Sequence, residues 1–179
     1  MCAQLAQLEE AMAAFASSFD PAVISAAQAE GVMERAARIE HMAATVKALA
    51  AARMAATELW SLDGDRSPAH MLARRTGSNV SAAAQALEMA TKLAHHAKTE
   101  AAARRGELSL AQASAVADAA EADPACEEEL LALASRASLQ ELREESGRRV
   151  AAASDATEAH ARIHAQRAVR SWTGTDGVW

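Results

Sequence analysis

Each of the three prolines in this 179-residue chain directly follows a residue that favours the start of a helix. An aspartate or serine side chain accepts hydrogen bonds from the free N–H groups of a first helical turn, and a proline at the next position has no N–H to lose. Two serines, each followed three residues later by Gln or Glu, form capping boxes. The sequence therefore marks five helix starts, at Asp20-Pro21, Ser67-Pro68, Asp123-Pro124, Ser109-Leu-Ala-Gln112 and Ser138-Leu-Gln-Glu141.

Alanine dominates the apolar part of the sequence. Hydrophobic residues make up 51% of the chain, but roughly half of them are alanine, and aromatic residues reach only 3%. Alanine is the best helix former, and it removes little area from water when it is buried. Seven glycines and three prolines are too few for the many turns of an all-β protein. We therefore predict an all-α fold with closely approaching helices.

Residues 1–62 are predicted to form a long-helix N-terminal arm. Its first helix carries large apolar residues at alternating steps of three and four, and a second helix over about 21–59 carries a similar row of smaller ones. Such seams are typical of coiled coils and helical hairpins, and they indicate a homodimer through residues 1–59. The seam residues are Leu5, Leu8, Met12, Phe15 and Phe19, then Val23 or Ile24, Ala27, Val32, Ala36, Ile39, Ala43, Val46 and Ala50.

Residues 63–172 are predicted to form a helical bundle. A polar loop at 61–66 precedes four short helices at about 67–75, 79–96, 109–122 and 124–136. Residues 97–105 form either a fifth helix or a continuation of the helix before them. A last long helix from Ser138 to about Trp172 is interrupted by Gly147. Residues 173–179 then favour the start of a truncated β-hairpin or a tail.

The charge is unevenly distributed along the chain, whose net charge is −6. Residues 66–106 carry seven bases and two acids, whereas residues 107–145 carry ten acids and two bases. A basic segment inside an acidic chain indicates a local anionic partner. The alternative is that the basic segment packs against the acidic one within the chain.

The strongest candidate for a binding site lies within the basic segment, at residues 68–88. Gly77 between two short helices, with Ala73 before it and Val80 after it, has the spacing of a helix-turn-helix-like αα-corner. Arginines at the end of its first helix would meet phosphates, and polar residues of its second helix could read bases. A purely structural corner is the alternative interpretation. The candidate contacts with double-stranded DNA are Arg74, Arg75, Asn79, Ser81, Gln85 and Lys92.

No catalytic motif is found in the sequence. His160 and His164 share a helix face at a spacing that can bind zinc, but the HExxH pattern needs a glutamate where Ala161 stands. We interpret this pair as solvated polar residues, with a metal site as the weaker alternative. The sequence therefore predicts no cofactor, no catalytic or metal-binding residue and no small-molecule substrate.

The remaining signals concern location. The chain has no secretory signal, no apolar stretch of membrane-spanning length and no disulfide framework, since Cys2 and Cys126 are its only cysteines. We therefore predict a cytoplasmic protein without membrane contact.

Several stretches resemble one protein family. They include Leu72-Ala73-Arg74-Arg75-Thr76-Gly77-Ser78, residues 90–93, Ala103-Arg-Arg-Gly-Glu-Leu-Ser-Leu-Ala-Gln-Ala113, Glu128-Glu-Leu-Leu-Ala-Leu-Ala134, Ser138-Leu-Gln-Glu-Leu142 and Arg170-Ser-Trp-Thr-Gly-Thr-Asp-Gly177. The Gly-Glu-Leu-Ser element with the following Gln-Ala is the most specific of them. On these residues, from about 20 to 177, the chain resembles domain of unknown function 222, the 13E12-repeat family of GC-rich bacterial genomes.

In that family the helical region usually precedes an HNH nuclease module, a ββα-metal fold that cuts DNA with one bound divalent ion. The resemblance implies a non-catalytic helical domain of an HNH endonuclease-like protein, contributing DNA docking or dimerisation. All six histidines lie on predicted helices and no HNH module follows, so no catalytic residue carries over. We expect a fragment, an excised domain or a natural truncation. A structural coiled-coil interaction module without nucleic-acid contact is the alternative.

Overall fold

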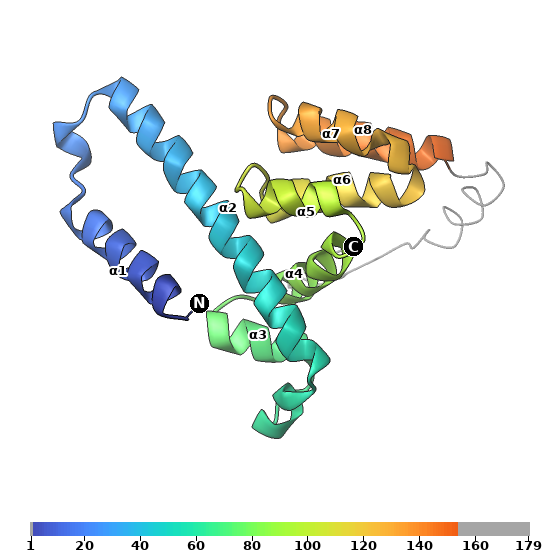
Figure 1. Ribbon diagram of the computed structural model, residues 1–179, viewed down its shortest axis with the longest axis horizontal. Helices are drawn as coiled ribbons and strands as arrows, with labels where there is room; N and C mark the ends of the chain where they lie inside the picture. Colours follow the sequence, from blue (N-terminus) through green and yellow to red (C-terminus); the bar gives the residue numbers. More distant parts are fainter. Residues whose placement is uncertain (1, 154–179) are drawn as a thin grey trace, which may run out of the picture. The chain divides into compact units, whose positions relative to one another are not determined.

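The computed structural model describes residues 2–153, and every regular element in that range is helical (Figure 1). The range contains eight α-helices and three short 3-10 helices. The predicted all-α fold class is therefore confirmed. The predicted helix beyond Ala153, with His160 and His164, and the predicted hairpin or tail at 173–179 lie outside the described residues.

The chain divides into two compact units, Met1–Ile39 and Glu40–Trp179. The first unit contains α1 (Cys2–Ser18), the 3-10 helix η1 (Pro21–Val23) and the beginning of α2 (Ala26–Ala56). None of its described residues, 2–39, is buried. The predicted domain limits at residues 62 and 172 remain predictions.

The prediction of one helix over 21–59 is wrong at its start. Asp20 caps only the short turn η1, where its Oδ1 accepts a hydrogen bond from the Ala22 N–H at 2.9 Å. Helix α2 begins after a capping box of its own: the Ser25 N–H donates to Gln28 Oε1 at 2.8 Å, and the Gln28 N–H donates to Ser25 Oγ at 3.3 Å. Ser25-Ala-Ala-Gln28 is the same signal as the boxes at Ser109 and Ser138. This helix start was not predicted, although its signal is present in the sequence.

The described part of the second unit is a helical bundle around α6. Besides the remainder of α2, it contains η2 (Leu59–Asp63), α3 (Pro68–Thr76), α4 (Val80–Leu93), α5 (Ala97–Arg104), α6 (Leu110–Ala122), η3 (Pro124–Cys126), α7 (Glu127–Ala134) and α8 (Leu139–Ala153). Helix α6 contacts α4, α5, α7 and α8. Both capping boxes predicted at the starts of α6 and α8 are present.

Two predicted helices differ in extent from those observed, and a third is not interrupted where the sequence predicts it. The segment predicted as a helix over 79–96 ends at Leu93, and α5 follows as a separate helix after His96. Asp123-Pro124 starts only the 3-10 turn η3, and α7 begins after it. Helix α8 continues through Gly147, because one glycine weakens a helix by only about 1 kcal/mol and neighbouring packing compensates.

The main core combines alanines with a few large side chains. Leu93, Leu108, Leu130 and Leu142 are each at most 2% exposed, and they surround the buried alanines and Val116 of α6. Alanine leaves room for neighbouring helices to approach, and the leucines fill the spaces between them. This arrangement gives an alanine-rich chain enough apolar burial for a stable core.

A second, smaller core holds the C-terminal part of α2 against the α3–α4 pair. Ala51 of α2 packs with Leu72, Ala73 and Ala83. The buried Thr45 donates its hydroxyl to the carbonyl of Ala103 at 3.3 Å and to that of His41 at 2.9 Å. These contacts tie α2 to α3, α4 and the end of α5.

Candidate nucleic-acid interface

The α3–α4 pair, residues 68–93, contains all six predicted DNA contacts, with Lys92 close to its end. Ser67 caps α3, with its Oγ accepting from the His70 N–H at 3.3 Å. Gly77 ends the helix in the left-handed conformation at φ 68°, and the Ser78 N–H then donates to the Ala73 carbonyl at 3.1 Å. This is the pattern in which glycine is favoured, because a side chain is strained at positive φ. The predicted role of Gly77 in the turn is confirmed.

Arg74 and Arg75 lie on the surface at the end of α3, but both have acidic partners. Arg74 makes a two-point contact with Asp65, through Nε to Oδ1 at 3.1 Å and Nη2 to Oδ2 at 2.7 Å. Arg75 donates from Nη2 to Asp63 Oδ2 at 2.6 Å. We call these four side chains the arginine–aspartate cluster.

The arginine–aspartate cluster is electrically balanced. The hydrogen bond from Arg74 lowers the pKa of Asp65 below its usual range, and the same bond raises the pKa of Arg74. Both groups therefore stay charged at neutral pH. The Asp65 side chain is only 8% exposed, whereas both arginine side chains are half exposed. A phosphate that approached the arginines would compete with the two aspartates for them.

The polar residues at the start of α4 have two different roles: one caps the helix, and two are exposed on its surface. Asn79 uses its Oδ1 to accept the Ala82 N–H at 2.7 Å, so it caps the helix. Ser81 and Gln85 are exposed and lie one helical turn apart. They form the part of the predicted site that faces solvent from one side of α4.

Lys92 does not belong to the same patch. It follows Asn79 by 13 residues, or about 20 Å along the helix. Its Nζ contacts Glu88 at 2.8 Å and Asp118 at 2.5 Å, and its side chain is 24% exposed. These partners raise the pKa of Lys92 well above its usual value, first through the hydrogen bond to Asp118. Lys92 therefore joins α4 to α6.

Lys98 and Thr99 of the basic segment also contact the acidic segment. Lys98 donates to Glu128 Oε1 at 2.6 Å. Glu127 Oε1 accepts from the N–H and hydroxyl of the buried Thr99, at 3.0 and 2.8 Å, and so satisfies donors in the first turn of α5. Together with Lys92–Asp118, these contacts confirm that part of the basic segment packs against the acidic one.

Sequence reasoning missed the two aspartates of the arginine–aspartate cluster. They stand in the Asp63-Gly-Asp65 turn, directly before a capped helix that ends in two arginines. The available signal was an acidic turn directly before a nine-residue helix that has two arginines in its last turn. This pattern could have predicted the ion pairs. It was outweighed by the general basic character of residues 66–106.

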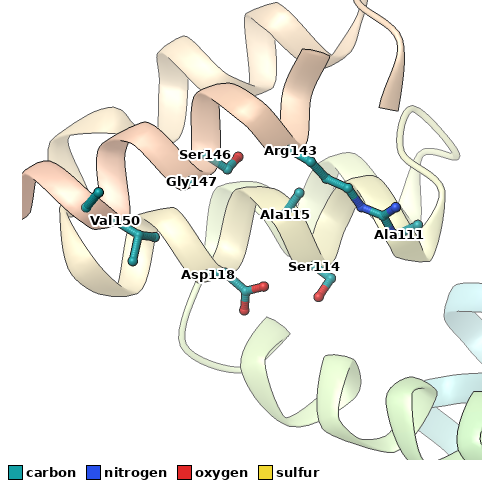
Figure 2. A pocket seen from close by; sticks show the side chains of 9 residues that line it. Ala111, Ser114, Ala115, Asp118, Arg143, Ser146, Gly147 and Val150 are labelled. Carbon is teal, nitrogen blue, oxygen red and sulfur yellow. The ribbon is translucent and has the colours of Figure 1, made fainter. Parts of the chain in front are cut away.

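A groove of about 480 Å³ lies between α6 and α8 (Figure 2). Figure 2 shows Ser114 and Asp118 on α6 and Arg143 extending from α8, and small residues such as Ala115 and Gly147 also line the groove. Asp118 is the only carboxylate in the lining, and it is already paired with Lys92. The groove therefore contains no pair of groups for acid–base catalysis.

Within residues 2–153, no group of three or more His, Cys, Asp or Glu side chains is arranged to hold a metal ion. Among the helices of that range, none is both long enough and apolar enough to cross a membrane.

The chain was also compared with known proteins. No protein family, no curated protein and no solved structure matches it.

Proposed function

We propose that this chain is a non-catalytic helical docking domain that contacts the phosphate backbone of duplex DNA through its α3–α4 pair. The observation that carries the proposal is the adjacent exposure of Arg74 and Arg75, each half exposed at the end of α3. Guanidinium groups match the geometry of phosphate oxygens and can bind them through two hydrogen bonds. Arg66, exposed in the loop before α3, adds a third cation.

Residues at the start of α4 supply the weaker part of the contact. Gln85 and Ser81 share one exposed side of the helix, and the amide NH2 of Asn79 stays available while its oxygen caps α4. Such side chains hydrogen-bond to phosphates or to base edges. We assign Lys92 no part in this contact because it pairs with Glu88 and Asp118.

Asp63 and Asp65 determine how strongly the site binds. They form ion pairs with the guanidinium groups of Arg74 and Arg75. A DNA phosphate must therefore displace an aspartate carboxylate in order to bind an arginine. We therefore expect weak binding that decreases steeply with salt. The likeness to the 13E12-repeat family supports a role beside a nuclease, in which this domain positions the nuclease on DNA and contributes no catalytic residue.

The test is a titration of a fluorescent duplex with the full chain at several salt concentrations, read by anisotropy. The double variant Arg74→Ala/Arg75→Ala should weaken binding and reduce the slope of log affinity against log salt by about 2. Arg104→Ala/Arg105→Ala is the matched control, because it also removes two adjacent, half-exposed, ion-paired arginines at a helix end. The control should bind as the wild type does.

A second variant tests the aspartates. Asp63→Asn/Asp65→Asn frees both arginines and should tighten duplex binding by on the order of tenfold. Circular dichroism of each variant confirms that the helices are intact. Absence of binding by the wild type at low salt, or equal losses in the two arginine pairs, would contradict the proposal.

A second candidate function is an assembly module without nucleic-acid contact. The ion pairs Lys92–Asp118 and Lys98–Glu128 favour it, because they neutralise cations of the basic segment within the chain. This function predicts no salt-dependent duplex binding by any of the variants.

A further inference from the structure

Helix α1 of the first unit carries a continuous row of large apolar side chains that are exposed to solvent. Helix α1 buries none of its residues, and its seam of Leu5, Leu8, Met12, Phe15 and the adjoining Phe19 is 39–67% exposed. Phe15 and Phe19 stack with ring centroids 5.7 Å apart, so this row is continuous at that end. Large apolar side chains in one row on an exposed helix mark an interaction surface.

Helix α2 carries a second exposed row of different composition. Ile39 and Val46 are 44% and 48% exposed, and the alanines between and beyond them, Ala43 and Ala50, are exposed as well. The buried residues of α2 lie on a different side of the helix, at Thr45, Ala48 and Ala51. The exposed row is therefore available to a partner while α2 stays attached to the bundle.

The two rows complement each other in size. The α1 row consists of leucine, methionine and phenylalanine, whereas the α2 row alternates alanine with β-branched residues. In helix pairs, large side chains insert into the spaces that small ones leave. One chain thus carries both a row of protruding residues and a row that receives them.

The charges next to the rows also complement each other. The charged side chains of α1 are Glu9 and Glu10, both acidic. Two exposed cations, Arg35 and Lys47, flank the α2 row, and they outnumber the one exposed acid that directly adjoins it, Glu40 beside Ile39. Packing of α1 on α2 would place opposite charges at the edge of the contact.

We propose that these surfaces pair between two copies of this chain, with α1 of each copy packed on the α2 row of the other. A chain that carries both halves of a contact can form a closed two-fold dimer. Seven large apolar side chains at roughly 100 Å² each give about 700 Å² per copy, close to the roughly 800 Å² per partner of a specific interface. The pairing does not depend on the proposed DNA contact.

Light scattering after size exclusion tests the mass of the full chain over a range of concentrations. The wild type should have twice the monomer mass of 18.7 kDa. Leu8→Glu/Phe15→Glu should reduce the mass to that of a monomer. Leu62→Glu is the matched control, because Leu62 is 80% exposed in η2, away from both rows, and this variant should remain dimeric. Equal thermal unfolding of the bundle in all variants excludes loss of the fold.

Mixing two defective chains tests which helices pair. Ile39→Glu/Val46→Glu damages only the α2 row and should also be monomeric. A mixture of this variant with Leu8→Glu/Phe15→Glu should regain dimers, since one intact α1 then meets one intact α2. A monomeric wild type would overturn the proposal, because α1 would then pack on its own α2 or remain free. A dimeric α2 variant would also overturn it, because α1 would then pair with α1.

Discussion

Residues 2–39 and residues 40–153 are built from similar alanine-rich helices, yet only the second range contains buried residues. The second unit places Leu93, Leu108, Leu130 and Leu142 among its alanines, each almost completely covered. In the first unit, equally large residues such as Leu8 and Met12 are exposed. Each large side chain contributes about 1.5–3 kcal/mol when buried, far more than an alanine does. The difference teaches that alanine permits close packing, while the position of the few large residues decides which helices form a core.

The cysteines provide the largest expected contrast between the two regions. Cys2 is exposed on α1, whereas Cys126 is buried, and burial raises the pKa of its thiol. Because the thiolate is the reactive form and access requires the bundle to open, Cys126 should react at least about 1,000-fold more slowly than Cys2 with a disulfide reagent. Labelling followed by mass spectrometry measures both rates. As a control, both cysteines should be labelled at similar rates in denaturant. Similar labelling rates in native buffer would show that Cys126 is not protected by the bundle.

Truncation of one leucine in each region should give the next largest contrast. Leu142→Ala leaves a cavity in the main core and should lower the free energy of unfolding by about 3 kcal/mol. Leu8→Ala should lower it by less than about 0.5 kcal/mol, because Leu8 is 67% exposed. Urea unfolding followed by circular dichroism, at concentrations low enough to keep the chain monomeric, gives both values. Comparable losses would show that α1 belongs to the folded core.

Glycine substitutions should have the smallest effects, and with opposite signs. Gly77 has φ 68°, so Gly77→Ala should destabilise the α3–α4 pair by about 1 kcal/mol. Gly147 lies inside α8 with open space around an added Cβ, so Gly147→Ala should stabilise the bundle by about 0.5–1 kcal/mol. Gly31→Ala in α2 should increase helix content while leaving the midpoint of bundle unfolding unchanged. Thermal unfolding of the three variants measures these differences. A shift of the unfolding midpoint of the bundle by Gly31→Ala would show that both units unfold together.

Most helix starts could be predicted because their causes are local. Ser67, Ser109 and Ser138 each cap a helix at the predicted place, through hydrogen bonds that span only three residues. The sequence left open whether α5 is separate from α4. No proline or glycine marks the separation, and His96 makes no capping hydrogen bond through its side chain. Instead, the start of α5 contacts α7, far along the chain. Lys98 donates to Glu128, and the Thr99 N–H donates to Glu127.

The sequence predicted which residues of the candidate site are exposed, but it did not predict the ion pairs that they form. Arg74 and Arg75 are exposed at the end of α3, as the sequence indicates, but Asp65 and Asp63 hold them. Lys92 was grouped with them because it is basic and near in sequence, whereas helix geometry places it at the far end of α4. Charge counted along a sequence says nothing about which opposite charges meet in space.

The amino-acid sequence by itself determined that this chain is helical and where most of its helices begin, because propensity and capping act within about four residues. Only the tertiary structure decided which side of α2 is covered, since the buried side, at Thr45, Ala48 and Ala51, is no more apolar in sequence than the exposed row. It also decided which acids outside their own helices pair with Arg74, Arg75, Lys92 and Lys98, because those ion pairs join residues 9 to 30 positions apart. Contacts over such separations depend on how the helices pack, which local signals do not specify.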